Sequence, residues 1–261
     1  MTSGEVAAAS AFWTAAVRAR ETGRPDRLFD DPWAAELAGE RGRELLRRKE
    51  ERDGREDVLL PLRTRWFDDA VTAALATGAD QLVELGSGLD TRPYRLRPAS
   101  GTRAFQLDQP SVLRHKEAVL RGRLPPDHDV TDVPTDLTGE WPEDLRGAGF
   151  EPSRRTVWMA EGLLMYLDHD AATRLLSAAA RLSAPRSVLL LDTLARTAQV
   201  SAGARFAPDD LSSLLRAHGW AEREHTTIAG PARAYGRLPD RLESRATRAG
   251  YTYLLAVADR P

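Results

Sequence analysis

The chain has 261 residues, 42 % of them hydrophobic and 29 % charged, which is typical of a globular protein with one main core. Its 37 basic and 39 acidic side chains leave a net charge of −2, which argues against a nucleic-acid-binding surface. The lack of cysteine excludes disulfides, thiolate metal sites and thiol nucleophiles. No apolar run approaches the ~20 residues that cross a bilayer, and no signal peptide is recognisable. We therefore expect a cytoplasmic protein without a membrane segment or a metal.

The N-terminal third carries helical signals. Residues 1–76 are expected to form a helical extension that caps the rest of the chain. Within it, Asp31 and Pro32 stand in the order of a helix cap followed by proline. The densely charged stretch 40–57 predicts a solvated helix face, and residues 63–76 return to helical spacing.

From residue 81 onward, strand and helix patterns alternate, which is typical of a parallel sheet. Helices are expected at 111–121 and 169–183, with Asp168 as the cap of the second, and Asp210 is expected to open another. The expected strands are 81–86, 103–108, 128–133, 156–161, 187–193, 222–228 and 251–258. We therefore predict an α/β core over 77–261.

Residues 195–245 form the least regular part of this core. We expect them to form a lid over the substrate, whose arginines could orient an acceptor carboxylate. The lid carries Arg196, Arg205, Arg233, Tyr235 and Arg237.

The most informative motif begins in an apolar run that ends at Glu84 and continues into Gly86-Ser87-Gly88. The run indicates a buried strand, and the glycines indicate a tight turn where a ligand can approach the backbone. Twenty residues beyond Gly88, a second apolar run ends in Asp108, at the distance where α/β domains bind a ribose diol. Together these features predict a bound nucleoside cofactor.

The details of the turn favour one nucleoside over others. No Gly-Lys-Ser/Thr follows, which excludes a P-loop, and Thr91 replaces the third glycine of the dinucleotide pattern. Glu84 would repel a pyrophosphate but suits a cationic amino-acid group. The cofactor predicted is therefore S-adenosylmethionine, with an NAD-dependent oxidoreductase as the alternative.

The chain resembles the leucine carboxyl methyltransferase-like family of S-adenosylmethionine-dependent O-methyltransferases, and especially its bacterial branch of tetracenomycin-type polyketide carboxylate methyltransferases. The most specific string is Gly-x-Gly-x-Asp-Thr-Arg, at 86–92. The segments that carry the resemblance are 24–34, 62–69, 84–92, 107–110, 136–137 and 160–167.

The resemblance implies a class I methyltransferase fold, a Rossmann-like seven-stranded sheet with helices on both faces. It places Asp136 and Leu137 against the adenine and assigns the methionine carboxylate to Arg63, with Arg20 as a further donor. Guanidinium groups suit such a carboxylate because they can bind it in a bidentate manner.

Glu161 follows a central strand, at the sheet edge where α/β ligands sit, and is expected to bind the methionine ammonium or favour the sulfonium. The reaction expected is in-line methyl transfer. A carboxylate acceptor is already ionised and needs no base, whereas a phenol or alcohol needs one. His169 and His225 are then the candidate bases. Tyr166 is a candidate for orienting the acceptor, a role inferred only from its position in the sequence.

The expected function is methylation of a small-molecule carboxylate or phenol from secondary metabolism. A protein C-terminal carboxylate and a non-catalytic cofactor-binding role are the alternatives within the family. The expected partners are a small-molecule substrate and, as one option, a second copy of the chain in a homodimer.

Overall fold

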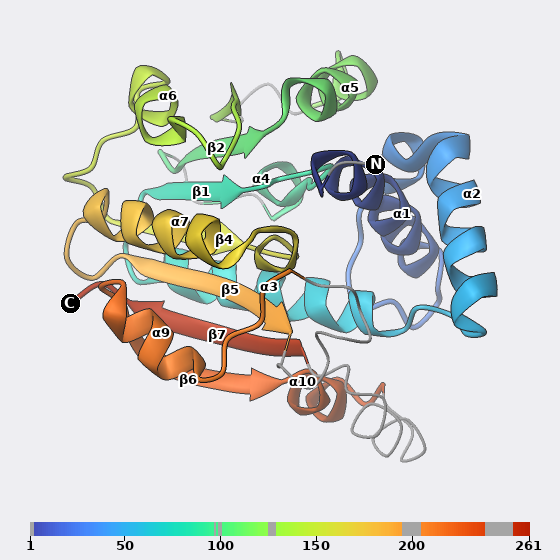
Figure 1. Ribbon diagram of the computed structural model, residues 1–261. Helices are drawn as coiled ribbons and strands as arrows, with labels where there is room; N and C mark the ends of the chain where they lie inside the picture. The colour runs from blue at the N-terminus through green and yellow to red at the C-terminus, as the bar shows by residue number, and fades with distance from the viewer. Residues whose placement is uncertain (1–2, 97, 99–100, 125–128, 195–204, 238–252) are drawn as a thin grey trace.

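The computed structural model describes residues 3–96, 98, 101–124, 129–194, 205–237 and 253–261 (Figure 1). Its strands are β1 (Gln81–Leu85), β2 (Arg103–Asp108), β3 (Val130–Pro134), β4 (Thr156–Ala160), β5 (Val188–Leu194), β6 (Ala221–Thr227) and β7 (Tyr253–Asp259). Its helices are α1 (Ser3–Thr22), α2 (Ala34–Asp53), α3 (Leu59–Ala76), α4 (Arg92–Arg95), α5 (Pro110–Leu120), α6 (Trp141–Gly147), the 3-10 helix η1 (Leu164–Tyr166), α7 (His169–Arg181), α9 (Leu211–Ala217) and α10 (Ala229–Ala234).

The strands form one mixed sheet in the order β3-β2-β1-β4-β5-β7-β6 (Figure 1). β1 to β5 are parallel, and β7 runs antiparallel between β5 and β6. Because neighbouring parallel strands end at the same edge, the loops after β1, β2 and β4 meet there. The predicted α/β class with a seven-stranded sheet is confirmed.

Apolar side chains cover both faces of the sheet. On one face, Trp158 of β4 packs with α6, α7 and α9, and Leu215 of α9 is fully buried there. On the other face, Met159 and Leu190 pack against Phe67 of α3 and against α10. Burial of each large apolar side chain contributes about 1.5–3 kcal/mol, so α3 is an integral layer of the core. The part of 1–76 that stands apart from the sheet is therefore α1 and α2.

α1 and α2 form a helical pair with its own apolar cluster, in which Val17 and Leu37 are fully buried. α5 closes this cluster with Val112 and Leu120. The outer face of α2 carries exposed arginine–glutamate pairs, which confirms the solvated helix expected there. Helix α2 also contains a break at Gly39, whose φ of +54° lies in the left-handed region.

The described part of the region predicted as a lid includes one strand of the sheet and two short helices. This part, 205–237, contains α9, β6 and α10, and β6 pairs with β7 along its length. Most of this part is therefore built into the core, while Arg205 at its start lines the cavity, and the lid stays a prediction. Residues 195–204 and 238–245 lie outside the described residues.

The ends of the seven strands and of the helices predicted at 111–121 and 169–183 fall within two residues of their predicted positions, whereas α3 begins four residues before the predicted 63. The side chain of Asp168 caps α7 and that of Asp210 caps α9, as predicted. Within the described ranges, no helix combines the length and the apolar character that a bilayer crossing requires.

Candidate functional site

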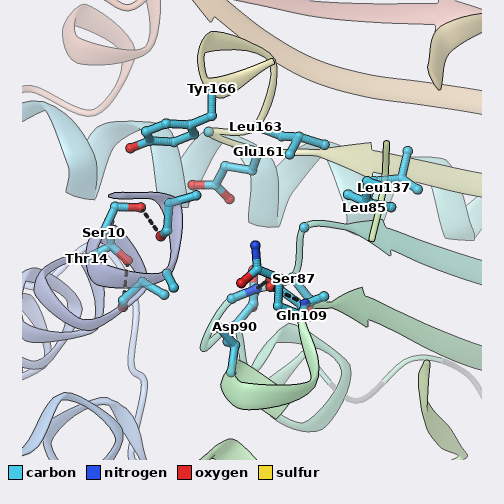
Figure 2. Close-up of a pocket in the computed structure, with 18 of the residues that line it drawn as sticks. Ser10, Thr14, Leu85, Ser87, Asp90, Gln109, Leu137, Glu161, Leu163 and Tyr166 are labelled. Atoms are coloured by element: carbon cyan, nitrogen blue, oxygen red, sulfur yellow. Dashed lines mark hydrogen bonds between the residues drawn. The ribbon is translucent and has the colours of Figure 1, made fainter. Parts of the chain in front are cut away.

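A cavity of about 550 Å³ opens at the carboxyl ends of β1, β2 and β4 (Figure 2). Its walls come from the loops after these strands and after β3, from η1, and from one side of α1. This volume lies in the range of small-molecule and cofactor sites. The described residues contain no cluster of histidine, cysteine and acidic side chains able to hold a metal ion.

The glycine turn forms the floor of this cavity, as predicted. Gly86 and Gly88 have φ values of +69° and +54°, which favour glycine over other residues. A Cβ on Gly86 would lie 3.0 Å from Leu163 Cδ1, and one on Gly88 would lie 3.3 Å from the Cβ of Ala11. Between them, Ser87 is buried in the cavity wall, and its Oγ has no hydrogen-bond partner among the described residues. An orphaned hydroxyl in a cavity wall fits a site that binds a polar ligand.

Asp108 links the second strand to the turn. Its carboxylate accepts hydrogen bonds from the backbone N–H groups of Gly88 and Gln109, both at 2.6 Å. Burial raises the pKa of Asp108 above its usual value, although the two N–H donors oppose this rise. The residue also lines the cavity, so its remaining acceptor capacity faces the place predicted for a ribose.

Asp136 and Leu137 line the far side of the cavity, in the loop after β3. The Asp136 carboxylate accepts from the backbone N–H and the hydroxyl of Thr138, and this closes a tight local turn. Leu137 packs against the apolar cluster that contains Leu85, and both line the cavity, so an apolar wall stands beside an acceptor group (Figure 2). This pairing suits a planar base that carries an amino group.

Glu84 does not line the cavity, and this corrects the role expected for it. Its side chain is fully buried, one oxygen accepts from the Gln106 amide, and the other has no partner. Burial, with the neighbouring Asp90 carboxylate, raises the pKa of Glu84 to about 8. Glu84 is therefore largely neutral at pH 7. It packs beneath the glycine turn as a buried hydrogen-bond acceptor and does not act as a counter-charge to an ammonium.

Arg63 and Glu161 both line the cavity and are joined by an ion pair, with Nε 2.9 Å from Oε1. Arg63 also reaches Asp192 on β5, at 3.3 Å. Arg63 and Glu161 are 98 positions apart in the sequence, and the fold brings these two predicted site residues into contact. Each neutralises part of the other's charge, and the pair presents a cation and an anion side by side in the cavity wall, which suits a zwitterionic ligand group.

Arg92 is a site residue whose role the sequence analysis missed, although it belongs to the quoted glycine motif. Its side chain is 2 % exposed and pairs with Asp68, Asp90 and Glu161, the last at 2.7 Å. It therefore fixes the second oxygen of Glu161. The signal was the arginine at the end of Gly-x-Gly-x-Asp-Thr-Arg, where Asp90 is a partner within the motif, but Asp68 and Glu161 lie on other elements.

The second cation proposed for the methionine carboxylate, Arg20, lies elsewhere. It pairs with Glu50 and Glu56 at the junction of α2 and α3, and it does not line the cavity. The arginine of α1 that lines the cavity is Arg18, held by Asp31 at 2.9 Å and by the carbonyl of Leu89. Arg18 and Arg20 are two residues apart, just over half a helical turn, so their side chains point to different sides of α1.

The predicted acceptor groups divide into two sets. Tyr166 and Arg205 line the cavity, and Figure 2 shows Tyr166 across from Ser10 and Thr14 of α1. The other described candidates lie outside it, since Tyr235 donates to Asp69 and Arg237 pairs with Glu21.

The two suspected histidines also lie away from the cavity. His225 is exposed on β6 beside Glu222, and His169 is exposed at the start of α7, beside Phe206. Arg233 lies outside the cavity too, while Arg196 is not among the described residues.

The sheet order and the cavity at its carboxyl edge define a class I S-adenosylmethionine-dependent methyltransferase fold. Solved structures share this architecture. The N-methyltransferase NodS from Bradyrhizobium japonicum WM9, in complex with S-adenosyl-l-homocysteine, aligns over 95 % of this chain and 98 % of its own, with a TM-score of 0.51 and 16 % identity. A DUF574 family protein from Streptomyces avermitilis aligns over 95 % and 97 %, with a TM-score of 0.61 and 16 % identity.

Sequence comparison narrows the class to a family. The family model for leucine carboxyl methyltransferase matches residues 11–180, and the chain belongs to this family. An S-adenosyl-L-methionine-dependent methyltransferase of Parafrankia sp. is 42 % identical over 70 % of this chain, which spans 62 % of that relative's length. Another, from Frankia alni, is 40 % identical over 78 % of this chain and 79 % of its own. S-adenosylmethionine is thus the family's cofactor, while the tetracenomycin-type branch stays a prediction.

Proposed function

We propose that the chain is an O-methyltransferase that uses S-adenosylmethionine to methylate a small-molecule acceptor, with a carboxylate as the preferred acceptor group. The observation that carries this proposal is one cavity that extends from Asp108 and Leu137 to Tyr166 and Arg205 under α1. Cofactor-binding and acceptor-binding groups therefore share a single enclosed space.

The cofactor end is assigned by chemistry. The glycine turn and the orphaned Ser87 hydroxyl accommodate the methionine portion, Asp108 accepts from the ribose hydroxyls, and Asp136 with Leu137 holds the adenine. Arg63 takes the methionine carboxylate. When bound, S-adenosylmethionine supplies an electrophilic methyl group on a sulfonium.

The acceptor end supports a carboxylate. Among the described lining residues there is no histidine, so a phenol would have to give its proton to a weakly basic carboxylate. A carboxylate needs no base, because it is ionised at neutral pH. Tyr166 and Arg205 would orient this carboxylate beneath α1, and its oxygen would take the methyl group from the sulfonium, which leaves as the neutral thioether.

A labelling experiment tests the acceptor class. The protein is incubated with methyl-tritiated S-adenosylmethionine in three separate reactions. The acceptors are pooled aromatic carboxylic acids in the first, the corresponding phenols in the second, and a peptide that ends in leucine in the third. We expect the label to be transferred to the acids. Alkali should then release it as methanol, because methyl esters hydrolyse in alkali and phenol ethers do not. Label confined to the peptide or to the phenols would contradict the carboxylate proposal.

Two glycine variants provide the matched control. Gly86→Val and Gly122→Val both place a β-branched residue at a positive φ, +69° and +73° respectively. Only Gly86 lines the cavity, whereas a Cβ on Gly122 meets nothing within 4 Å. We expect Gly86→Val to weaken S-adenosylhomocysteine binding at least tenfold, with Gly122→Val like the wild type. Equal affinities in calorimetry would contradict the assigned cofactor site.

A further inference from the structure

Seven side chains form a continuous network of buried ion pairs beside the cavity, here called the arginine–carboxylate cluster. No member has a side chain more than 13 % exposed. Four members line the cavity and three lie behind them. The cluster comprises Arg63, Asp68, Asp90, Arg92, Arg95, Glu161 and Asp192.

Asp192 occupies a particular place in this cluster. It is fully buried on β5, does not line the cavity, and accepts hydrogen bonds from Arg63 and from the backbone N–H of Gly162. The other charged groups that face it are Arg63 of α3 and Glu161 after β4. On β7, its register partner is the apolar Leu255. Asp192 therefore acts on the cavity through its charge and its neighbours, without direct contact.

The charges of the cluster do not cancel when every member is ionised. It contains three arginines and four carboxylates, so it carries one excess negative charge, and this excess disappears when Asp192 is neutral. S-adenosylmethionine carries one more positive charge than S-adenosylhomocysteine, because the product has lost the sulfonium. The two ligands are otherwise the same apart from the methyl group.

We propose that the ionised carboxylate of Asp192 makes the cavity bind S-adenosylmethionine in preference to S-adenosylhomocysteine. This inference rests on the proposed function and extends it to the choice between cofactor and product. Asp192 then acts without touching the ligand, because the electric field of its carboxylate favours the sulfonium over the neutral thioether of a ligand that makes the same contacts. Preference for the charged form also weakens the hold on the product once the methyl group has left.

The preference depends on pH through Asp192. Burial raises the pKa of this carboxyl to about 6, against the opposing effect of Arg63 and the Gly162 N–H group. At pH 7 the group is therefore ionised, and at pH 5 it is mostly protonated. The affinity ratio of the two ligands should fall as the pH is lowered through 6.

The test is calorimetry of both ligands with the wild type and with Asp192→Asn, at pH 7 and at pH 5. The amide retains the hydrogen bond to Gly162 and removes the charge. We expect the wild-type ratio, Kd of S-adenosylhomocysteine over Kd of S-adenosylmethionine, to fall about tenfold from pH 7 to pH 5. This is the order of magnitude of the interaction between unit charges near a protein surface, where the effective dielectric is about 20. In Asp192→Asn, the ratio should be low at both pH values.

Glu224→Gln is the matched control, since Glu224 is exposed on β6 and its replacement removes one carboxylate far from the cavity. This variant should keep the wild-type ratio and its pH dependence. A ratio that is unchanged in Asp192→Asn would overturn the inference while leaving the proposed function intact. If that variant does not fold, a pH-independent ratio in the wild type overturns it equally. Failure of both ligands to bind would overturn the proposed function and the inference together.

Discussion

Asp108 has two structural partners and faces the cavity as well, so its replacement has two separable consequences. Its carboxylate holds the glycine turn through the N–H of Gly88, and its free acceptor capacity points to the ribose. An ordinary alanine variant would confuse the two roles, because loss of the turn also weakens every ligand. The ligand must therefore be varied together with the residue.

We predict that Asp108→Asn weakens S-adenosylhomocysteine binding about tenfold to a hundredfold, since hydrogen bonds to a charged group contribute about 1.5–3 kcal/mol. The same variant should bind an analogue that lacks both ribose hydroxyls as weakly as the wild type does. Calorimetry of the four combinations measures the coupling. If both ligands lose the same factor, Asp108 supports only the turn.

At this scale, the sequence correctly placed the residues whose surroundings are local, while their cofactor-binding roles stay predictions. Gly86 and Gly88 sit in a turn that the adjacent sequence specifies, and Asp108 ends a recognisable strand. The roles of Glu84 and Arg20 were wrong because burial and ion-pair partners come from other elements. The Arg63–Asp192 pair joins residues 129 positions apart, which no local pattern indicates.

Among the elements, α1 has the role that the sequence analysis described least. Residues 1–76 were expected to cap the core, and one side of α1 does form a wall of the cavity. The helix shows only weak amphipathic patterning, because alanine is its commonest residue and lies on several of its faces. Its position is set by α2, against which it packs closely. A Cβ on Gly42 of α2 would lie 2.5 Å from the carbonyl oxygen of Phe12.

We therefore predict that Gly42→Ala displaces α1 and weakens S-adenosylhomocysteine binding several-fold. The overpacked contact should also lower the free energy of unfolding by about 1–3 kcal/mol. Hydrogen exchange should increase over residues 7–18, which can be followed by mass spectrometry alongside calorimetry. Gly147→Ala is the control, because a Cβ there meets nothing within 4 Å at the end of α6. Unaltered exchange and affinity in Gly42→Ala would show that α1 does not form part of the binding site.

The strands were the most predictable elements, since a strand buried on both faces reads as a continuous apolar run, as in Val188–Leu191. β6 belongs to the same sheet but lies at its edge with mostly exposed side chains, and α9 and α10 are short. These features made the stretch 195–245 look irregular and led to the expectation of a lid. The position of β7 between β5 and β6 depends on contacts across the chain, so only the family resemblance could indicate it.

For the whole molecule, the buried acids determine how stability depends on pH. Glu84 and Asp192 have pKa values raised to about 8 and about 6, so the folded state holds their protons more tightly than the unfolded state does. Their contribution is complete below pH 4 and decreases as the pH rises, through 6 for Asp192 and through 8 for Glu84. Asp90 acts in the opposite direction, because its pKa is lowered to about 2 and its contribution is lost only on acidification below pH 4.

We predict that Glu84→Gln, which retains an acceptor for Gln106 and cannot ionise, removes the largest part of this loss. Its free energy of unfolding relative to the wild type should increase by up to about 1.4 kcal/mol per pH unit between pH 5 and pH 8. Above pH 8 the difference should level off, because Glu84 is then ionised in both states of the wild type. Urea unfolding at pH 5, 6, 7, 8 and 9 measures the difference directly, with Glu224→Gln as the exposed control. Wild-type and Glu84→Gln curves that run parallel across this range would mean that Glu84 is ionised in the folded protein, and its buried charge would then require a direct partner.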